Sequence, residues 1–389
     1  MSERWQPVFS HSDSPPEGLY IHVPFCFHKC HYCDFYSIVE NDTDRHNHFV
    51  ERLLEEFDAL AALPGAPPLA PRSIFIGGGT PTFLHPDAWR SLAQGLDRRI
   101  DRHRLAEFTV EANPETVEPP LMGLLVDLGV NRISLGAQSF QPRLLKALER
   151  WHDPAGVARA VATARRGGIG RVNIDLIFAI PGQELTELDA DLDAALALEP
   201  DHLSYYGLTY EPHTALTRRL ERGQVQPIDD DLAAAMYERI LDRLEAAGYV
   251  HYEISNWARP GHTCHHNLLY WHDADWLGVG PSAASHIGGQ RWKNAPHLGL
   301  YLASRGLPPA QDVELPDPAR AIGERLMMGL RLRDGVALAW LSQALPADDP
   351  RWAVIHQAIA DNLLEQTATH LRLTRRGLLL ADDLLMRLI

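Results

Sequence analysis

The chain has 389 residues, of which 45% are hydrophobic and 22% are charged. A chain of this length and composition buries a full-sized core, in two or three domains or in one large domain with an appendage. Its 51 acidic residues outnumber its 36 basic ones, and the formal net charge is −15. This charge argues against a general nucleic-acid or anionic-membrane binder, because such proteins present a basic surface.

No segment approaches 18 consecutive apolar residues, so the sequence predicts no integral membrane segment. The first 18 residues are polar and Pro-rich, without the apolar stretch of a signal peptide. Three of the four cysteines lie within eight residues, which favours a metal site in a reducing compartment over a disulfide framework. We therefore expect a cytoplasmic protein.

Short β-rich runs alternate with helical stretches between residues 19 and 215. The expected strands are 19–23, 73–76, 108–112, 132–136, 172–178 and 202–208, and the expected helices are 43–62, 86–99, 119–128, 141–149, 154–166 and 184–197. Such alternation predicts a parallel sheet with right-handed crossovers. Six units are fewer than the eight of a complete barrel, which needs about 250 residues. We expect an α/β fold built on an open, partial parallel β/α barrel.

The remaining segments have different patterns. We expect residues 1–18 to form an irregular N-terminal segment. We expect residues 216–315 to form a connecting section with a helix at 229–247. Residues 316–389 predict a small, mostly helical C-terminal domain with one short strand, HLRLT, a pattern typical of a winged helix.

The strongest motif is the cysteine loop, in which Cys26, Cys30 and Cys33 follow the first expected strand with the spacing C-x3-C-x2-C. Three thiolates on one loop are suited to hold three irons of a 4Fe-4S cluster and to leave the fourth iron open. The alternative is a Cys3His zinc site. Its fourth ligand would be His22, His28 or His31.

A triple glycine follows the next expected strand, at Gly77–Gly79, and Thr80 comes after it. Glycines at this place let the backbone approach a ligand closely. Together with the cysteine loop at the same end of a parallel sheet, they resemble the radical S-adenosylmethionine enzymes. This resemblance implies that the methionine amine and carboxylate chelate the open iron, and that reductive cleavage yields a 5′-deoxyadenosyl radical.

Polar residues stand where the later strands finish, at the face where barrel sites form. Glu111 is placed to accept a hydrogen bond from the methionine ammonium, and Arg150 is placed to pair with the methionine carboxylate. Gln138 is placed to hydrogen-bond the edge of a ligand, and Asp175 to hydrogen-bond ribose hydroxyls. The alternative for Asp175, within an apolar run, is a buried carboxylate satisfied by the protein itself.

Five motifs in order resemble one branch of that superfamily: YIHVPFC, GGGTPT, VEANPE, RISLGAQSF and DLIFAIPGQ. They are similar to the oxygen-independent coproporphyrinogen dehydrogenases (HemN) and their HemW relatives, over about residues 19–335. The resemblance implies that Cys26, Cys30 and Cys33 hold the cluster. It implies an S-adenosylmethionine pocket formed by Tyr20, Gly79, Thr80, Glu111, Gln138, Arg150 and Asp175, with the Leu208–Thr209 backbone at the adenine.

Three features favour the HemW-type haem chaperones over the enzyme. Phe35 stands where the enzyme has a further cysteine, only 19 residues precede Tyr20, and the signature H-N-x-x-Y-W occurs at 266–271. The resemblance implies that the protein binds haem and passes it to an acceptor haemoprotein, which we expect in the respiratory membrane. Oxidative decarboxylation of coproporphyrinogen III is the alternative. Cleavage of S-adenosylmethionine and the oligomeric state, a homodimer included, stay open.

The signature makes His266 the leading haem ligand, because imidazole is a common axial ligand and aromatic faces pack on porphyrins. His265 and Cys264 are adjacent alternatives. The alternative is a purely structural role, in which Tyr270 and Trp271 are core aromatics and His266 is a loop histidine with its hydrogen bonds made within the protein.

Overall fold

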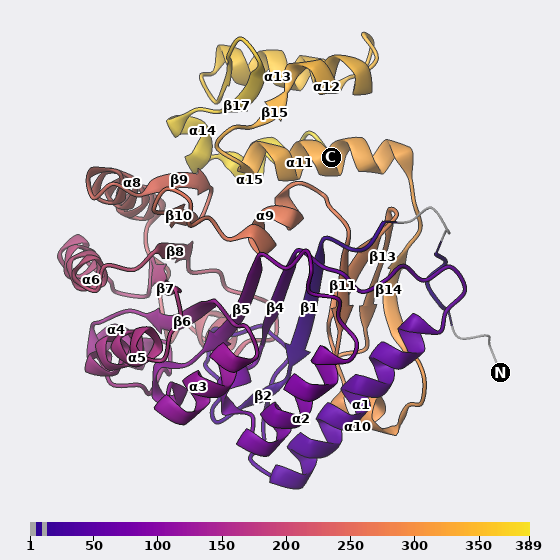
Figure 1. Cartoon of the computed structure of the whole chain (residues 1–389). Coiled ribbons are helices and arrows are strands. Elements are labelled where there is room, and N and C mark those ends of the chain that lie inside the picture. Colours follow the sequence, from indigo (N-terminus) through magenta and orange to yellow (C-terminus); the bar gives the residue numbers. More distant parts are fainter. Residues whose placement is uncertain (1–4, 10–13) are drawn as a thin grey trace.

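The computed structural model describes residues 5–9 and 14–389 (Figure 1). Its centre is a twelve-stranded sheet in the order β14-β13-β12-β11-β1-β4-β5-β6-β7-β8-β10-β9. The six predicted barrel strands are neighbours and parallel: β1 (Gly18–Val23), β4 (Ser73–Gly78), β5 (Glu107–Ala112), β6 (Arg132–Gln138), β7 (Arg171–Phe178) and β8 (His202–Gly207). The prediction of an open, partial parallel barrel of six units is confirmed.

Helices follow these strands and cover one face of the sheet (Figure 1). They are α1 (Thr43–Ala61), α2 (Pro86–Asp97), α3 (Pro119–Asp127), α4 (Pro142–Ala147), α5 (Pro154–Arg166) and α6 (Leu185–Ala197), with 3-10 turns η1 (Pro81–Phe83) and η2 (Pro114–Thr116). Several helices begin at a signal that the sequence carries. In α5, for example, the Asp153 side chain accepts from the Ala155 amide and Pro154 occupies the first turn.

Strand alternation separates an apolar helix-facing side from a polar barrel interior. In β5, Phe108 and Val110 join the hydrophobic core and are 0% exposed. Their neighbours Glu107, Thr109 and Glu111 have polar side chains on the opposite face. Because the same alternation runs through the parallel strands, the interior is rich in hydrogen-bonding groups, which is the setting of a binding site rather than of a dry core.

Residues 216–315 extend this sheet at both edges. On one side β10 (Asn256–Ala258) pairs antiparallel with β8 and β9 (Val250–Glu253). On the other side β11 (Trp276–Val279) runs parallel to β1, and the sheet continues through β12 (Ala284–Ile287), β13 (Gln290–Asn294) and β14 (Ala310–Glu314). The helices of this section are α7 (Ala215–Glu221), α8 (Asp230–Ala246), α9 (His265–Trp271) and α10 (Leu298–Ala303).

The C-terminal part consists of five helices around a small antiparallel sheet in the order β15-β17-β16. Its elements are α11 (Pro318–Arg331), β15 (Val336–Ala337), α12 (Leu338–Ala344), α13 (Arg351–Ala360), β16 (Leu364–Gln366), β17 (His370–Leu373), α14 (Arg375–Leu379) and α15 (Ala381–Met386). The expected mostly helical domain and the strand at HLRLT are both present. The domain lies beside α9 (Figure 1), and the Arg331 guanidinium lies 5.9 Å from the Trp271 ring centre.

Among the described residues, no helix combines the length and the apolar character that a membrane span requires.

Candidate functional site

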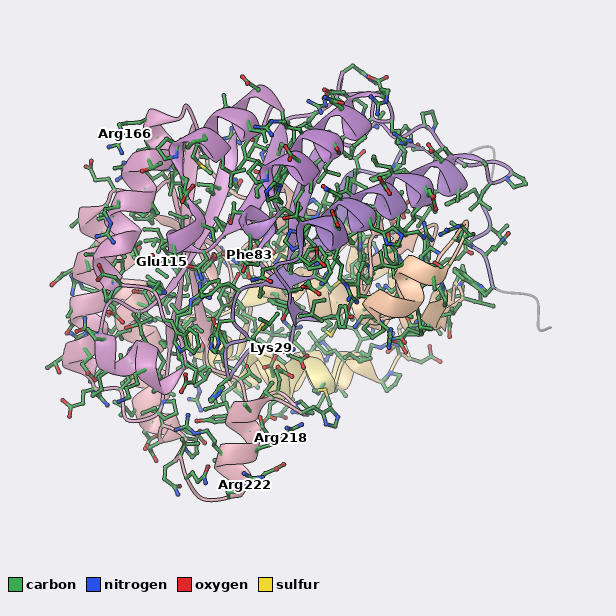
Figure 2. The ribbon with its side chains drawn as sticks, turned by 90° about the horizontal axis from the view of Figure 1, so that it is seen from below. Lys29, Phe83, Glu115, Arg166, Arg218 and Arg222 are labelled. Carbon is green, nitrogen blue, oxygen red and sulfur yellow. The ribbon has the colours of Figure 1, made fainter. Side chains whose placement is uncertain are left out.

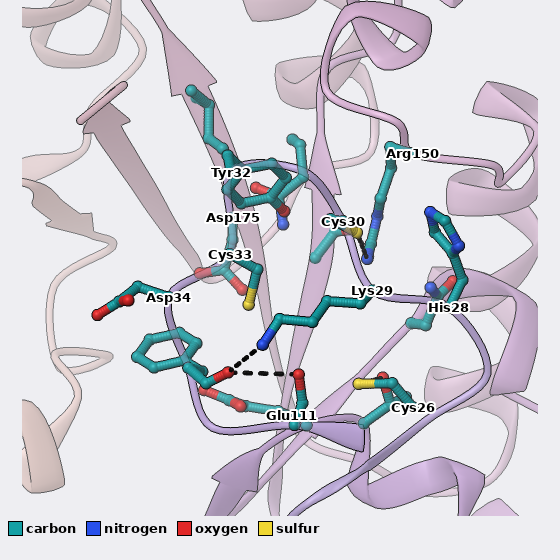
Figure 3. Close-up of a pocket in the computed structure, with 18 of the residues that line it drawn as sticks. Cys26, His28, Lys29, Cys30, Tyr32, Cys33, Asp34, Glu111, Arg150 and Asp175 are labelled. Atoms are coloured by element: carbon teal, nitrogen blue, oxygen red, sulfur yellow. Dashed lines mark hydrogen bonds between the residues drawn. The ribbon is translucent and has the colours of Figure 1, made fainter. Parts of the chain in front are cut away.

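A cavity of about 510 Å³ lies at the C-terminal ends of the barrel strands. It collects residues that are far apart in the sequence (Figure 3). Nine of the eleven predicted site residues line it: Cys26, Cys30, Cys33, Gly79, Thr80, Glu111, Gln138, Arg150 and Asp175, and so do Leu208 and Thr209. Tyr20 and His266 do not line it.

The cysteine loop leaves β1 and is closed by a short parallel pair, β2 (Phe25–Cys26) with β3 (Ile38–Val39). This pairing fixes both ends of the loop, so that its three thiols border one cavity. The Cys26 thiol lies 3.5 Å from the Thr80 hydroxyl, and Arg150 Nη1 donates to the Cys30 sulfur at 3.5 Å.

Electrostatics distinguish the metal-free thiols from a metal-bound state. Burial raises the pKa of Cys26, and burial and the neighbouring Cys30 and Cys26 thiols raise the pKa of Cys33 to about 11. Burial opposes the charge of Arg150, but Tyr32 and Cys30 outweigh it, so that its pKa is raised. The Cys26 and Cys33 thiols are therefore protonated without metal and release protons when a metal binds, while Arg150 stays a fixed positive charge.

The donor set fits an iron–sulfur cluster. A cubane distributes three thiolates over three irons, whereas zinc needs all its ligands within one coordination sphere. No three His, Cys, Asp or Glu side chains of the described ranges are arranged to hold a single ion. Three thiols that border one cavity are the protein donors that such a cluster needs, and the zinc site remains the alternative.

Glycine is required at two positions of the triple-glycine turn. Gly78 has φ +106°, and a Cβ there would lie 2.6 Å from the His22 ring. A Cβ on Gly79 would lie 2.6 Å from the Phe25 carbonyl oxygen. The Gly78 amide donates to the Glu111 carboxylate at 3.1 Å. The turn thus brings bare backbone between the cysteine loop and β5.

Two carboxyl groups lie in the interior below the cavity rim. Burial, with the Asp175 charge as the next cause, raises the pKa of Glu111 to about 8. Burial also raises the pKa of Asp175, although Ser134 Oγ and Asn173 Nδ2 each donate to it at 2.8 Å. An interior with two such carboxyl groups favours a cationic ligand, because a positive charge would relieve their mutual repulsion.

The remaining polar residues are held by the strand ends. Gln138 has φ +65° at a register shift between β6 and β7, and this places it at the cavity wall. Arg150 Nη2 donates to the Gly136 carbonyl at 2.6 Å. Tyr20 lies deeper, where its ring stacks on Phe75 and its hydroxyl shares a 3.1 Å hydrogen bond with His22. A contact between Tyr20 and a cavity ligand stays a prediction.

The structure places His266 at the opposite end of the barrel. Its Nδ1 shares a 2.9 Å hydrogen bond with Ser73, the first residue of β4, and its Nε2 shares one of 2.9 Å with the Tyr270 hydroxyl. The side chain is 1% exposed, and burial lowers its pKa to about 4. Both ring nitrogens are occupied, so iron ligation would require one of these bonds to break. This geometry matches the alternative of a structural histidine, whose hydrogen bonds are made within the protein.

The rest of the signature is likewise engaged in packing. Tyr270 meets Trp276 edge to face at 4.7 Å between ring centres. Asn267 Nδ2 donates to the Tyr252 hydroxyl at 3.2 Å and to the Glu253 carboxylate at 3.1 Å. The helix α9 therefore closes the end of the barrel opposite the cavity, and the haem-ligand role of His266, His265 or Cys264 stays a prediction.

Comparison with known proteins agrees with this geometry. A family model described as the radical SAM superfamily matches residues 20–195, and one described as the HemN C-terminal domain matches residues 317–380. The protein named heme chaperone HemW of Mycobacterium tuberculosis is 39% identical over 382 residues, which cover 96% of this chain and 95% of that protein. The chain belongs to the HemW family.

Other HemW relatives show similar coverage. That of Escherichia coli is 37% identical over 377 residues, covering 95% of this chain and 97% of its own, and that of Bacillus subtilis is 34% identical over 375 residues. The solved structure of coproporphyrinogen III oxidase (HemN) from Escherichia coli superposes with a TM-score of 0.83 over 96% of this chain and 90% of that chain. At 22% identity, this likeness shows that the HemW chain shares the HemN fold.

Sequence reasoning missed several cavity residues of this HemW chain. Asn113 lines the cavity with a buried side-chain amide nitrogen that has no partner, and Tyr206 and Trp151 also line it. Tyr206 belongs to the alternate residues of β8 whose side chains point into the barrel, and this alternation could have indicated it. Trp151 could have been found because it is adjacent to Arg150 in the sequence.

Proposed function

We propose that this HemW chain is a haem chaperone that holds a 4Fe-4S cluster and S-adenosylmethionine and delivers haem to acceptor haemoproteins. The observation that carries the proposal is the single cavity in which three thiols of one loop face the triple-glycine turn and two interior carboxyl groups. Membership of a family whose curated relatives are named heme chaperones supports the haem part.

Each cavity residue has a role that its chemistry supports. Cys26, Cys30 and Cys33 would hold the cluster, which when bound supplies an electron and an open iron vertex. Arg150, buried and positively charged, would pair with the methionine carboxylate. Glu111 would accept from the methionine ammonium, and Asp175 would bond the ribose hydroxyls.

Other polar groups would complete the S-adenosylmethionine pocket. Gly79, Thr80 and Gln138 would contact the ligand from the strand ends, and the Leu208–Thr209 backbone would meet the adenine. The expectation that the haem acceptor belongs to the respiratory membrane rests on the family resemblance alone, as does the expected cytoplasmic location.

The alternative is the decarboxylase reaction on coproporphyrinogen III. Phe35 occupies the place of the enzyme's additional cysteine, and in this structure its side chain is 65% exposed beside the cavity. A phenyl ring supplies neither a thiol nor a metal ligand, so this position favours the chaperone.

One anaerobic sample distinguishes the two functions. The reconstituted protein is supplied with S-adenosylmethionine and a reductant, and is then given either coproporphyrinogen III or haem followed by an apo-haemoprotein. We expect haem to bind and to pass to the acceptor faster than free haem reaches it, without protoporphyrinogen formation. Turnover of coproporphyrinogen III at about 1 per second or faster, a typical enzymatic rate, would establish the enzyme instead.

A further inference from the structure

A run of hydrogen bonds crosses the barrel interior from the cavity to helix α9. Its members are buried or half-buried side chains of β7, β8, β9 and α9: Asp175, Asn173, His202, Tyr252 and Asn267. The heavy-atom distances along the run, in this order, are 2.8, 2.6, 2.8 and 3.2 Å. Figure 1 shows α9 and β2 of the cysteine loop at opposite ends of the barrel strands, and Figure 2 views the end with the cysteine loop, where Lys29 is labelled. The run therefore joins the two ends of the barrel.

The donor and the acceptor of each bond follow from the chemistry of the groups. The Asn173 amide nitrogen faces the Asp175 carboxylate, because the amide oxygen in that place would meet a second acceptor. The Asn173 oxygen then faces His202 Nδ1, which must carry the proton. Burial lowers the pKa of His202 well below its ordinary value, so the ring is neutral and its Nε2 accepts. It accepts from the Tyr252 hydroxyl, whose oxygen accepts from Asn267 Nδ2. Every bond of the run therefore donates toward Asp175.

This run holds the Asp175 carboxylate from the inner side of the barrel. Asp175 Oδ1 accepts from Asn173 Nδ2, and Asp175 Oδ2 accepts from Ser134 Oγ, each at 2.8 Å. A carboxylate has about four acceptor sites on its two oxygens, so both oxygens keep lone pairs for further donors. Asp175 lines the cavity, where ribose hydroxyls would be such donors. A carboxylate that is already held on one side loses less entropy when it binds them on the other.

The Tyr252 hydroxyl selects the tautomer of His202. A neutral imidazole carries its proton on one of two nitrogens, and the hydrogen bond to the other nitrogen decides which. A phenol that donates to Nε2 keeps the proton on Nδ1, where it meets the Asn173 oxygen. In the other tautomer Nδ1 would be an acceptor opposite that oxygen, and the Asn173 amide would have to turn its oxygen toward Asp175. Tyr252 does not line the cavity, yet its hydroxyl decides how Asp175 is held.

We propose that Tyr252 and Asn267 are positioning residues for the ligand of the cavity. They act through His202 and Asn173 on the Asp175 carboxylate, which would touch that ligand. The inference rests on the proposed function, in which Asp175 bonds the ribose hydroxyls of S-adenosylmethionine. It gives Asn267, the asparagine of the H-N-x-x-Y-W signature, a role in the cofactor pocket that is independent of haem ligation. A site built to bond hydroxyl groups rejects a ligand that lacks them, so the run should govern the preference for ribose over a deoxyribose.

The test is equilibrium dialysis of the anaerobically reconstituted protein against S-adenosylmethionine and against its 2′,3′-dideoxyribose analogue, which lacks both hydroxyls. We expect the wild type to prefer S-adenosylmethionine by at least about tenfold. Tyr252→Phe should lower this preference about fivefold, because it weakens binding of S-adenosylmethionine and leaves binding of the analogue unchanged. Tyr249→Phe is the matched control and should keep the wild-type preference. Its hydroxyl is also buried, but donates to the Pro200 carbonyl at 2.6 Å, outside the run.

Two further variants show whether the effect passes through Asp175. Asp175→Asn should lose most of the preference for ribose. Adding Tyr252→Phe to Asp175→Asn should change the preference no further, because the effects of residues in one hydrogen-bonded chain do not add. Asn267→Ala should lower the preference in the same direction as Tyr252→Phe. It decides the question if Tyr252→Phe does not fold or loses its cluster.

The outcomes separate this inference from the proposed function. A wild-type preference in Tyr252→Phe would overturn the inference and leave the proposed function standing. An equal loss of affinity for both ligands would also overturn it, because it marks a structural role, and so would additive effects of Tyr252→Phe and Asp175→Asn. A wild type that binds both ligands equally, or that binds neither, would contradict the proposed ribose contact of Asp175 and this inference with it.

Discussion

Replacing Glu107 with alanine is expected to lower the free energy of unfolding by about 4 kcal/mol, because the change leaves a buried arginine without its counter-charge. Glu107 is 0% exposed and accepts from Arg132 Nε at 3.1 Å. It also accepts from the His266 and His265 amides at 3.0 and 3.2 Å, at the start of α9. Burial alone would raise the pKa of Glu107, but Arg132 and these amides outweigh it and lower the pKa.

Urea denaturation of the wild type and of Glu107→Ala measures this difference in the free energy of unfolding. The matched control is Glu365→Ala, which breaks an exposed pair with Arg372 at 2.7 Å and should cost less than about 1 kcal/mol. The direction in which the contribution of Glu107 to stability changes with pH follows from its lowered pKa. Its contribution is present at neutral pH and is lost as the pH falls through that pKa. A loss no larger than the control's would show that α9 closes the barrel end opposite the cavity without depending on this carboxylate.

Replacing Glu111 with glutamine is expected to stabilise the cluster-free protein at neutral and alkaline pH. Its pKa of about 8 in the folded protein exceeds the ordinary value of 4.5. Between pH 4.5 and 8 the unfolded chain loses this proton while the folded chain keeps it, so wild-type stability falls as the pH rises. The shift corresponds to at most about 5 kcal/mol at 1.36 kcal/mol per pKa unit.

The measurement is the free energy of unfolding of wild type and Glu111→Gln at pH 5 and pH 8.5. The advantage of the variant should be small at the lower pH and should grow by several kcal/mol at the higher one. Glu365→Gln, at a position 46% exposed, should show no such growth. An advantage that does not change with pH would mean that Glu111 ionises normally, and would remove the reason for expecting a cationic ligand beside it.

The barrel strands and helices were predictable because their signals are local. Apolar alternation marks the strands, and side chains such as Asp153 cap the helices where the sequence changes character. The cluster-binding end was predictable for a topological reason, since the ends of parallel strands meet at one face. Nine of the residues named from the motifs therefore border one cavity.

The end of the barrel that α9 closes was not predictable, because its contacts join residues far apart in the chain. The His266 amide meets a Glu107 carboxylate 159 positions away, and the His266 ring meets Ser73 at a separation of 193. No periodicity reports such pairs. A histidine in an aromatic signature is compatible with both a metal ligand and a satisfied core residue, and only the observed hydrogen bonds place it among the latter in this conformation.

The most direct test of the account is the electron paramagnetic resonance spectrum of the anaerobically reduced protein, recorded with and without S-adenosylmethionine. A cluster bound by Cys26, Cys30 and Cys33 has one iron without a protein thiolate, so the ligand should shift the signal. Cys264→Ala, which removes a buried thiol beside Glu107 and outside the cavity lining, should leave that shift intact. A cluster signal that S-adenosylmethionine does not change, or reconstituted protein without sulfide, would contradict the open iron on which the account rests.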